Sequence, residues 1–356
     1  MPKTQVNPYR RVAEHASALL LLAGAVSIVL YRIVLLQEAP LEGDSGVEFF
    51  PWRAVAFGAW LNGGSPFWTD LYQGGFPLVA EMQTALFYPP NLLLYAALPP
   101  LAAHSYSIVF HFLLAAVTMY FFLREISVGW TGAIIGATAF VFFGPVGGNT
   151  QYGIVAAFAW LPLLLLIAHR TCGPEAVSGK LRAFRNTLLA GVVFALIVLG
   201  GYPMAAASGF LLLAFYVLFL SFTGAPEGRL LSGPRRFPGA TLFLLLTGLV
   251  GLQLSAVQLF PTFELAQLSV RGLSVDPGFA LFGSASPLSL ATLLWRGVPL
   301  GTGGGNVIAS LYLGLVPALG VLVAVVSARR EPKALNGFFA GAAIVSFLVA
   351  LGGYTP

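Results

Sequence analysis

A series of long apolar segments, separated by short connections that carry most of the basic residues, most strongly constrains this chain. About 20 consecutive apolar residues are enough for a helix to cross the hydrocarbon of a bilayer. Hydrophobic residues make up 58% of the 356 positions and charged residues only 9%, whereas soluble domains carry roughly 25% charged residues. The sequence therefore predicts an all-α, polytopic membrane protein.

The apolar segments predict about nine transmembrane helices in one domain over residues 1–356. They cover 17–36, 101–123, 129–147, 153–168, 187–200, 204–222, 240–260, 307–327 and 337–351. Arg10 and Arg11 precede the first segment, and no small-residue cleavage site follows it. We therefore interpret 17–36 as an uncleaved first helix of a multi-pass protein.

The basic residues orient the bundle. With the N-terminus in the cytoplasm, 14 of the 18 lysines and arginines fall in cytoplasmic segments, as the positive-inside rule requires. These are Lys3, Arg10, Arg11, Arg124, Arg170, Lys180, Arg182, Arg185, Arg229, Arg235, Arg236, Arg329, Arg330 and Lys333. We expect a protein of the inner or plasma membrane with a cytoplasmic N-terminus.

A further apolar segment, 85–98, is short and contains Pro89 and Pro90. A crossing there would invert every later connection and place the basic ones outside. We therefore expect this segment to be re-entrant or to lie at the interface.

Two long connections then lie on the outer side, 37–84 and 261–306. Long loops on a rigid scaffold are where function concentrates. The first carries six acids against one base, Arg53: Glu38, Glu42, Asp44, Glu48, Asp70 and Glu81. From Glu48 to Asn62 it is rich in aromatic residues, with Trp52, Ala56 and Trp60 at four-residue spacing, which predicts a juxtamembrane amphipathic helix.

Composition also limits which kinds of ligand we expect the protein to bind. The net charge of +5 sits in short clusters between apolar runs, which does not suggest nucleic acid. The single cysteine, Cys172, excludes an internal disulfide, and the four scattered histidines form no zinc motif. No cofactor is predicted with certainty, and a divalent metal stays open.

Asp44 and Glu48 are the acids of most interest. Ser45 and Glu48 match a capping box, so Glu48 has two open interpretations, a helix cap and a functional acid. Since Ser45 would supply the cap, Asp44 is left for chemistry. A carboxylate close to the membrane surface can serve as a general base or hold a divalent ion.

Several other outer residues are candidates for substrate binding. Arg53 and Arg271 suit phosphate because a guanidinium is a bidentate donor, although Arg271 pairing with Asp276 or Glu264 is the alternative. The remaining candidates are polar groups on the outer side: Gln83, Tyr88, Gln151, Tyr202 and Glu264.

Short pieces along the chain, taken in order, resemble the YfhO-type family of bacterial membrane proteins. These pieces lie at 43–51, 74–78, 83–93, 159–162, 200–203, 258–264, 269–271 and 312–315. The resemblance implies a GT-C-type glycosyltransferase fold, with Asp44 in the place of the acid that follows the first helix in the family. Many family members run longer, so we expect this chain to be truncated at its C-terminus.

The resemblance implies transfer of a sugar from a polyprenyl-phosphate carrier to an envelope glycan or lipid acceptor. Asp44 would then accept the acceptor's proton, Arg271 would neutralise the leaving phosphate, and Gln83 and Tyr88 would orient sugar hydroxyls. One alternative is a transporter or flippase for a lipid-linked sugar, which would place charges in mid-helix. The other is a non-catalytic scaffold for assembly of the cell envelope.

Overall fold

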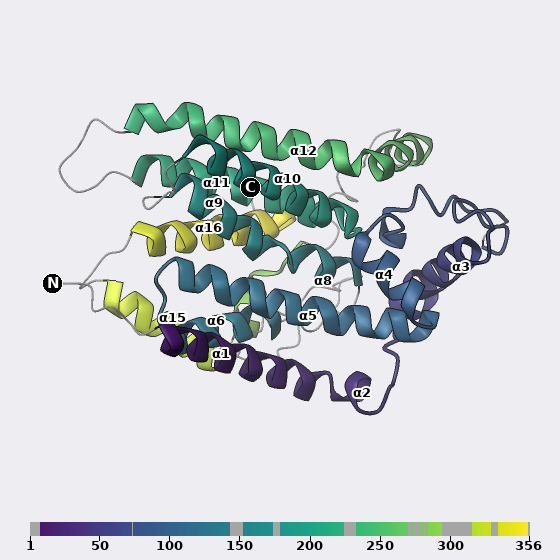
Figure 1. Cartoon of the computed structure of the whole chain (residues 1–356), viewed down its shortest axis with the longest axis horizontal. Helices are drawn as coiled ribbons and strands as arrows, with labels where there is room; N and C mark the ends of the chain where they lie inside the picture. The colour runs from purple at the N-terminus through teal and green to yellow at the C-terminus, as the bar shows by residue number, and fades with distance from the viewer. Residues whose placement is uncertain are drawn as a thin grey trace.

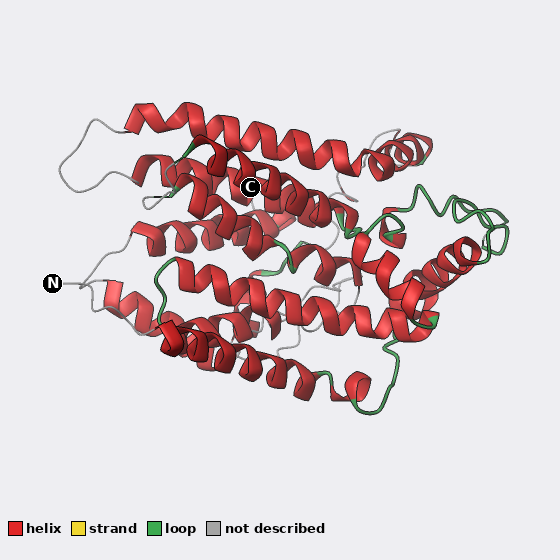
Figure 2. Ribbon diagram, in the orientation of Figure 1, coloured by secondary structure: helices red, strands yellow, loops and turns green. Residues whose placement is uncertain are grey.

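The computed structural model is a bundle of helices (Figure 1). It describes residues 8–72, 74–142, 152–173, 179–223, 233–269, 272, 278, 281, 284–293, 315–328 and 334–354. Within these residues the chain forms helices and connecting loops (Figure 2), and one isolated antiparallel bridge, between Thr69 and Phe76, is the strand-like pairing observed. The all-α prediction is confirmed for this part of the chain.

Six of the described helical segments are long and apolar enough to cross a membrane, which makes the protein multi-pass by length and composition. They comprise α1 (Pro8–Val29), α5 (Pro100–Glu125), α8 (Tyr152–Phe158) with α9 (Leu161–Cys172), α10 (Lys180–Leu199), α11 (Pro203–Thr223) and α12 (Gly233–Leu268).

Three shorter helices correspond to the remaining predicted spans. They are α6 (Trp130–Phe142), α15 (Leu315–Ala328) and α16 (Ala334–Ala350). The 13 residues of α6 extend only about 20 Å, less than the roughly 30 Å of a hydrocarbon core. The predicted spans 129–147 and 307–327 continue into residues outside the described ranges, so the count of nine stays a prediction.

The helices pack as expected for a protein in a lipid bilayer. Large apolar side chains face outward, for example Leu20 at 74% and Leu245 at 65% exposure, and lipid can cover them. Small residues form the contacts between helices: a β-carbon at Gly251 of α12 would collide with Phe194 of α10. Close approach at small residues supplies the dispersion contacts that hold helices together in lipid.

The first helix begins nine residues earlier than the predicted start at residue 17, and it ends at Val29 rather than residue 36. The charged first turn stays helical because Arg10 pairs with Glu14 one turn later, at 3.3 Å. The helix breaks at Leu30, and the short α2 (Tyr31–Val34) follows.

Helices α1 and α5 run antiparallel. His15 of α1 lies 2.9 Å from the hydroxyl of Tyr120 near the end of α5, whereas Ser45, beyond α1, contacts His104 at the start of α5. The chain between the two helices therefore leaves and returns at one end of the bundle, which we call the loop end (right in Figure 1). The helix in this connection, α4 (Pro89–Ala97), has nine residues and is too short to span, and whether it re-enters or lies at the interface stays a prediction.

The opposite end, where α1, α10 and α12 begin, carries most of the described bases, and we call it the basic end. These bases are Arg10, Arg11, Arg124, Arg170, Lys180, Arg182 and Arg185. This asymmetry is the pattern expected if the basic end faces the cytoplasm.

Helix α12 continues past Pro261, where the second long connection was predicted to begin, and it ends at Leu268. The helix persists because neighbouring polar groups hold this turn in place. Gln258 donates from its amide to the carbonyl of Val79 at 2.9 Å, and Thr262 donates to the carbonyl of Ala80 at 2.9 Å. Glu264 therefore lies on a helix rather than in a loop.

Candidate functional site at the loop end

The acid-rich connection folds into a π-helical turn, Ser45–Phe49, followed directly by α3 (Phe50–Leu61). The buried face of α3 includes Trp52 and Phe57, which stack on Phe76 and Tyr95 with ring centroids 5.2 and 4.4 Å apart. Of the predicted apolar face, Trp52 and Ala56 are buried and Trp60 is 42% exposed, and whether the helix lies at the membrane interface stays a prediction. Packing against the following loop and α4, rather than the spacing of tryptophans alone, decides which side of the helix is buried.

The predicted capping box is also wrong. Ser45 lies inside the π-helical turn, and its hydroxyl donates to the carbonyl of Pro40 at 2.9 Å. That donation leaves the Ser45 oxygen as the acceptor for Nε2 of His104, 3.0 Å away. Both side chains are buried, so this contact fastens the acidic turn to the first turns of α5.

Asp44 and Glu48 stand one helical turn apart on this fastened segment. Asp44 is exposed, whereas Glu48 is half-buried. Burial raises the pKa of Glu48, and the negative charge of Asp44 raises it further. Two neighbouring carboxylates in different environments are a common basis for acid–base chemistry. The four-residue spacing of these acids in the sequence is the signal that indicates the pair.

Arg53 is buried at 0% exposure rather than open to a phosphate. Its guanidinium donates to the carbonyl oxygens of Gln83, at 2.7 Å, and Thr84, at 3.2 Å. These bonds fix α3 against the segment 82–84. The geometry therefore gives Arg53 a structural role and does not favour the predicted contact with substrate.

Tyr88 is likewise used inside the protein. It is fully buried, and its hydroxyl lies 2.7 Å from Nε2 of His111 and 2.6 Å from the indole nitrogen of Trp160. Nδ1 of His111 lies 2.6 Å from the carbonyl of Ser107, which requires the proton on Nδ1. The tyrosine then donates to His111 and accepts from Trp160, so its hydroxyl links three elements and does not face a sugar.

Gln83 and Tyr202 are brought together at the same end. Gly201, which precedes Tyr202, has a φ of +91°, and a β-carbon there would lie 2.7 Å from the carbonyl oxygen of Met82. Only glycine allows this approach between the α10–α11 turn and the segment 82–84. Both Gln83 and Tyr202 are half-buried, and burial raises the pKa of Tyr202.

Glu264 is exposed and lies just beyond Thr262, the residue bonded to Ala80. The predicted residues Arg271 and Gln151 lie outside the described residues, so their roles stay predictions. Among the residues that the structure describes, no three His, Cys, Asp or Glu side chains gather as metal ligands.

The chain matches no protein-family model, no curated protein and no solved structure. The resemblance to the YfhO-type family and the GT-C fold therefore stay predictions, and a function has to be argued from the site.

Proposed function

We propose that this protein is a membrane glycosyltransferase that takes a sugar from a polyprenyl-phosphate carrier and transfers it to an envelope glycan or lipid at the loop end. The observation that carries the proposal is the pair Asp44 and Glu48. An exposed and a half-buried carboxylate share one fastened turn beside helices of membrane-spanning length. A lipid-linked donor presents its reactive carbon at this level, next to the membrane surface.

In the proposed reaction the acceptor hydroxyl attacks the anomeric carbon while the bond from that carbon to the phosphate oxygen breaks. Asp44 accepts the proton of the hydroxyl, and the lipid phosphate leaves with the bonding electrons. A positioned base of this kind typically contributes about 10²- to 10⁴-fold. Gln83 and Tyr202 orient sugar hydroxyls, and Arg271 neutralises the leaving phosphate.

The proposal includes the orientation of the chain. The basic end, with the N-terminus, faces the cytoplasm of a cell with an inner or plasma membrane, and the loop end faces outward. The excess of lysines and arginines at the basic end supports this orientation.

The test is transfer from defined polyprenyl-phosphate sugars by the full chain in nanodiscs. Asp44→Asn keeps the shape of the side chain and removes the base, so turnover should fall at least 10²-fold while donor binding is largely kept. Asp70→Asn is the matched control, because Asp70 is an acid of the same connection that accepts from the indole of Trp68. Full activity in Asp44→Asn would remove the general-base role, and an absence of transfer by the wild type would favour the scaffold.

A further inference from the structure

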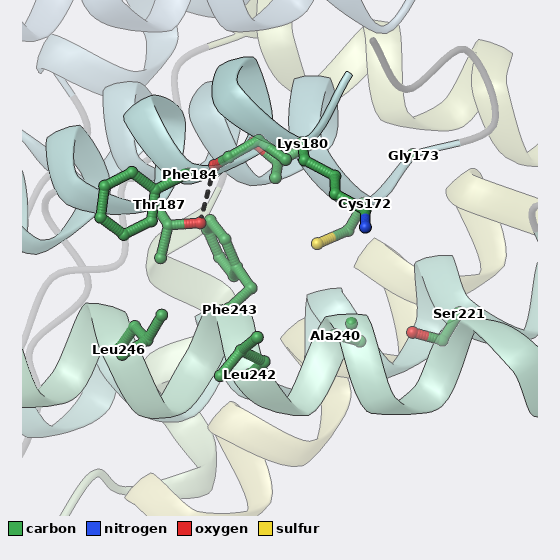
Figure 3. Close-up of a pocket in the computed structure, with 13 residues that line it drawn as sticks. Cys172, Gly173, Lys180, Phe184, Thr187, Ser221, Ala240, Leu242, Phe243 and Leu246 are labelled. Carbon is green, nitrogen blue, oxygen red and sulfur yellow. Dashed lines mark hydrogen bonds between the residues drawn. The ribbon is translucent and has the colours of Figure 1, made fainter. Parts of the chain in front are cut away.

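A cavity of about 620 Å³ lies at the basic end, at the opposite end of the bundle from the acidic pair. Figure 3 shows the residues that line it. Its wall combines the last turn of α9, the first two turns of α10, part of α12 and Ser221 of α11. The volume falls within the roughly 300–1,000 Å³ typical of ligand pockets.

The wall is apolar. Phe184, Leu242 and Leu246 line it, and the first two are more than half exposed, which opens the cavity to the hydrocarbon. Three hydroxyls also line it, but each donates to the carbonyl four residues earlier on its own helix: Thr171 to Ile167, Thr187 to Ala183 and Ser221 to Val217. The hydroxyl donors are therefore committed, and the surface left for a ligand is one that attracts acyl chains.

One cation stands at the mouth. Lys180 is the only charged residue among the thirteen that line the cavity, and Figure 3 shows its side chain beside Cys172. It is exposed, and no carboxylate of the described residues pairs with it. Within the part of the chain that the structure describes, its charge therefore faces no competing carboxylate.

The order of these groups along α10 matches the depth profile of a bilayer. Lys180 is the first residue of the helix, and Arg182 and Arg185 follow within two turns, which places this level at the headgroups. Ala183, Phe184 and Thr187 continue the same face, and Thr187 lies about 10 Å deeper at 1.5 Å per residue.

We propose that this cavity binds an anionic phospholipid, with the headgroup phosphate at Lys180 and one acyl chain along Phe184, Leu242 and Leu246. Basic pockets between transmembrane helices are suited to such headgroups, because a cation at the mouth and an apolar trough recognise both parts of the molecule. This inference does not depend on the proposed transferase activity.

The test is native mass spectrometry of the full chain in detergent, titrated with phosphatidylglycerol and with phosphatidylcholine of the same acyl chains. Phosphatidylglycerol should bind more tightly. Lys180→Gln should weaken its binding about fivefold, the effect of about 1 kcal/mol per base, and should weaken that of phosphatidylcholine less, because its choline offsets the phosphate charge. Arg182→Gln removes the same charge from the same turn outside the cavity and should change binding less than twofold.

A second pair of variants tests the apolar part. Ala183→Phe fills the cavity and should abolish binding of both lipids, whereas Leu181→Phe, on the exposed side of the same turn, should not. Equal losses in Lys180→Gln and Arg182→Gln would indicate a diffuse basic surface and overturn the proposal. Competition by glycerol phosphate alone, or a dimer that Ala183→Phe disrupts without changing lipid binding, would also overturn it.

Discussion

The two ends of the bundle differ in how they hold several of their polar groups. At the loop end, buried Arg53 donates to the carbonyl of Gln83 and half-buried Thr262 donates to that of Ala80, and Arg32 with Glu38 forms an exposed pair there. At the basic end the charges form exposed ion pairs on the helix surfaces, such as Arg170 with Glu125 at 2.7 Å.

This difference gives the two ends different roles: the loop end holds side chains in fixed positions, whereas the basic end keeps charges solvated. Exposed ion pairs contribute about 0–1 kcal/mol, whereas a buried acceptor that loses its donor costs about 1–3 kcal/mol. The loop end therefore specifies the position of the acidic turn, as a preorganised site requires. The basic end mainly keeps charges in water or at headgroups.

The largest effect is expected at Arg53. Arg53→Ala removes the donors to two buried carbonyls and leaves a cavity, so we expect a loss of about 3 kcal/mol or more in the free energy of unfolding. Thermal unfolding in detergent measures this loss of stability. Arg32→Ala is the control, because Arg32 pairs with Glu38 at an exposed site and should change stability by less than about 0.5 kcal/mol. Equal losses would break the distinction between buried and exposed cations.

The hydroxyl of Tyr88 comes next. Tyr88→Phe leaves both His111 and Trp160 without their shared partner, and we expect a loss of about 1–3 kcal/mol in the same measurement. Tyr31→Phe, at a residue 48% exposed, is the matched control and should be neutral. A neutral Tyr88→Phe would mean that the buried network does not hold the loop end.

The exposed pair at the basic end should give a smaller effect. A double-mutant cycle with Arg170→Ala and Glu125→Ala should yield a coupling of about 0.2–1 kcal/mol that shrinks as salt is added. The Arg170 side chain is 50% exposed, so water and ions screen the pair. A salt-independent coupling above about 2 kcal/mol would show that both ends position their charges alike.

The smallest effect concerns pH. Because the pKa of Glu48 is raised in the folded protein, the folded state binds the proton more tightly than the unfolded state, and stability falls as pH rises from about 4.5 toward the raised value. Glu48→Gln removes this loss. The unfolding temperatures of variant and wild type should agree near the acid limit and diverge in favour of the variant toward neutral pH. Glu42→Gln is the control. If Glu48→Gln is less stable than wild type at neutral pH, the sign of the predicted effect is wrong.

The helical bundle could be predicted because apolar periodicity and length are local properties of the sequence. The predicted helix boundaries were wrong where the helix continues beyond a residue whose type indicated an end. Arg10 looked like a flank but pairs with Glu14 within the helix, and Pro261 looked like an end but lies in a turn anchored by Thr262.

The candidate site was partly predictable for the same reason. Asp44 and Glu48 are four residues apart, so their pairing is visible in the sequence. Arg53 and Tyr88 were assigned to substrate, but their actual partners lie 30 and 23 residues away, at Gln83 and His111. Only the folded chain shows that these polar groups already bond to other parts of the protein.

The length of α12 ties the protein to the thickness of its membrane. At 1.5 Å per residue its 36 residues extend about 54 Å, well beyond a hydrocarbon core of about 30 Å. Its early turns form the wall with Leu242, and its later turns bond to Val79 and Ala80 through Gln258 and Thr262. A helix responds to a thinner bilayer by tilting. Because this helix is fastened to residues 79–80, we expect such a tilt to displace the neighbouring segment 82–84, which holds Gln83, so that bilayer thickness reaches the candidate site.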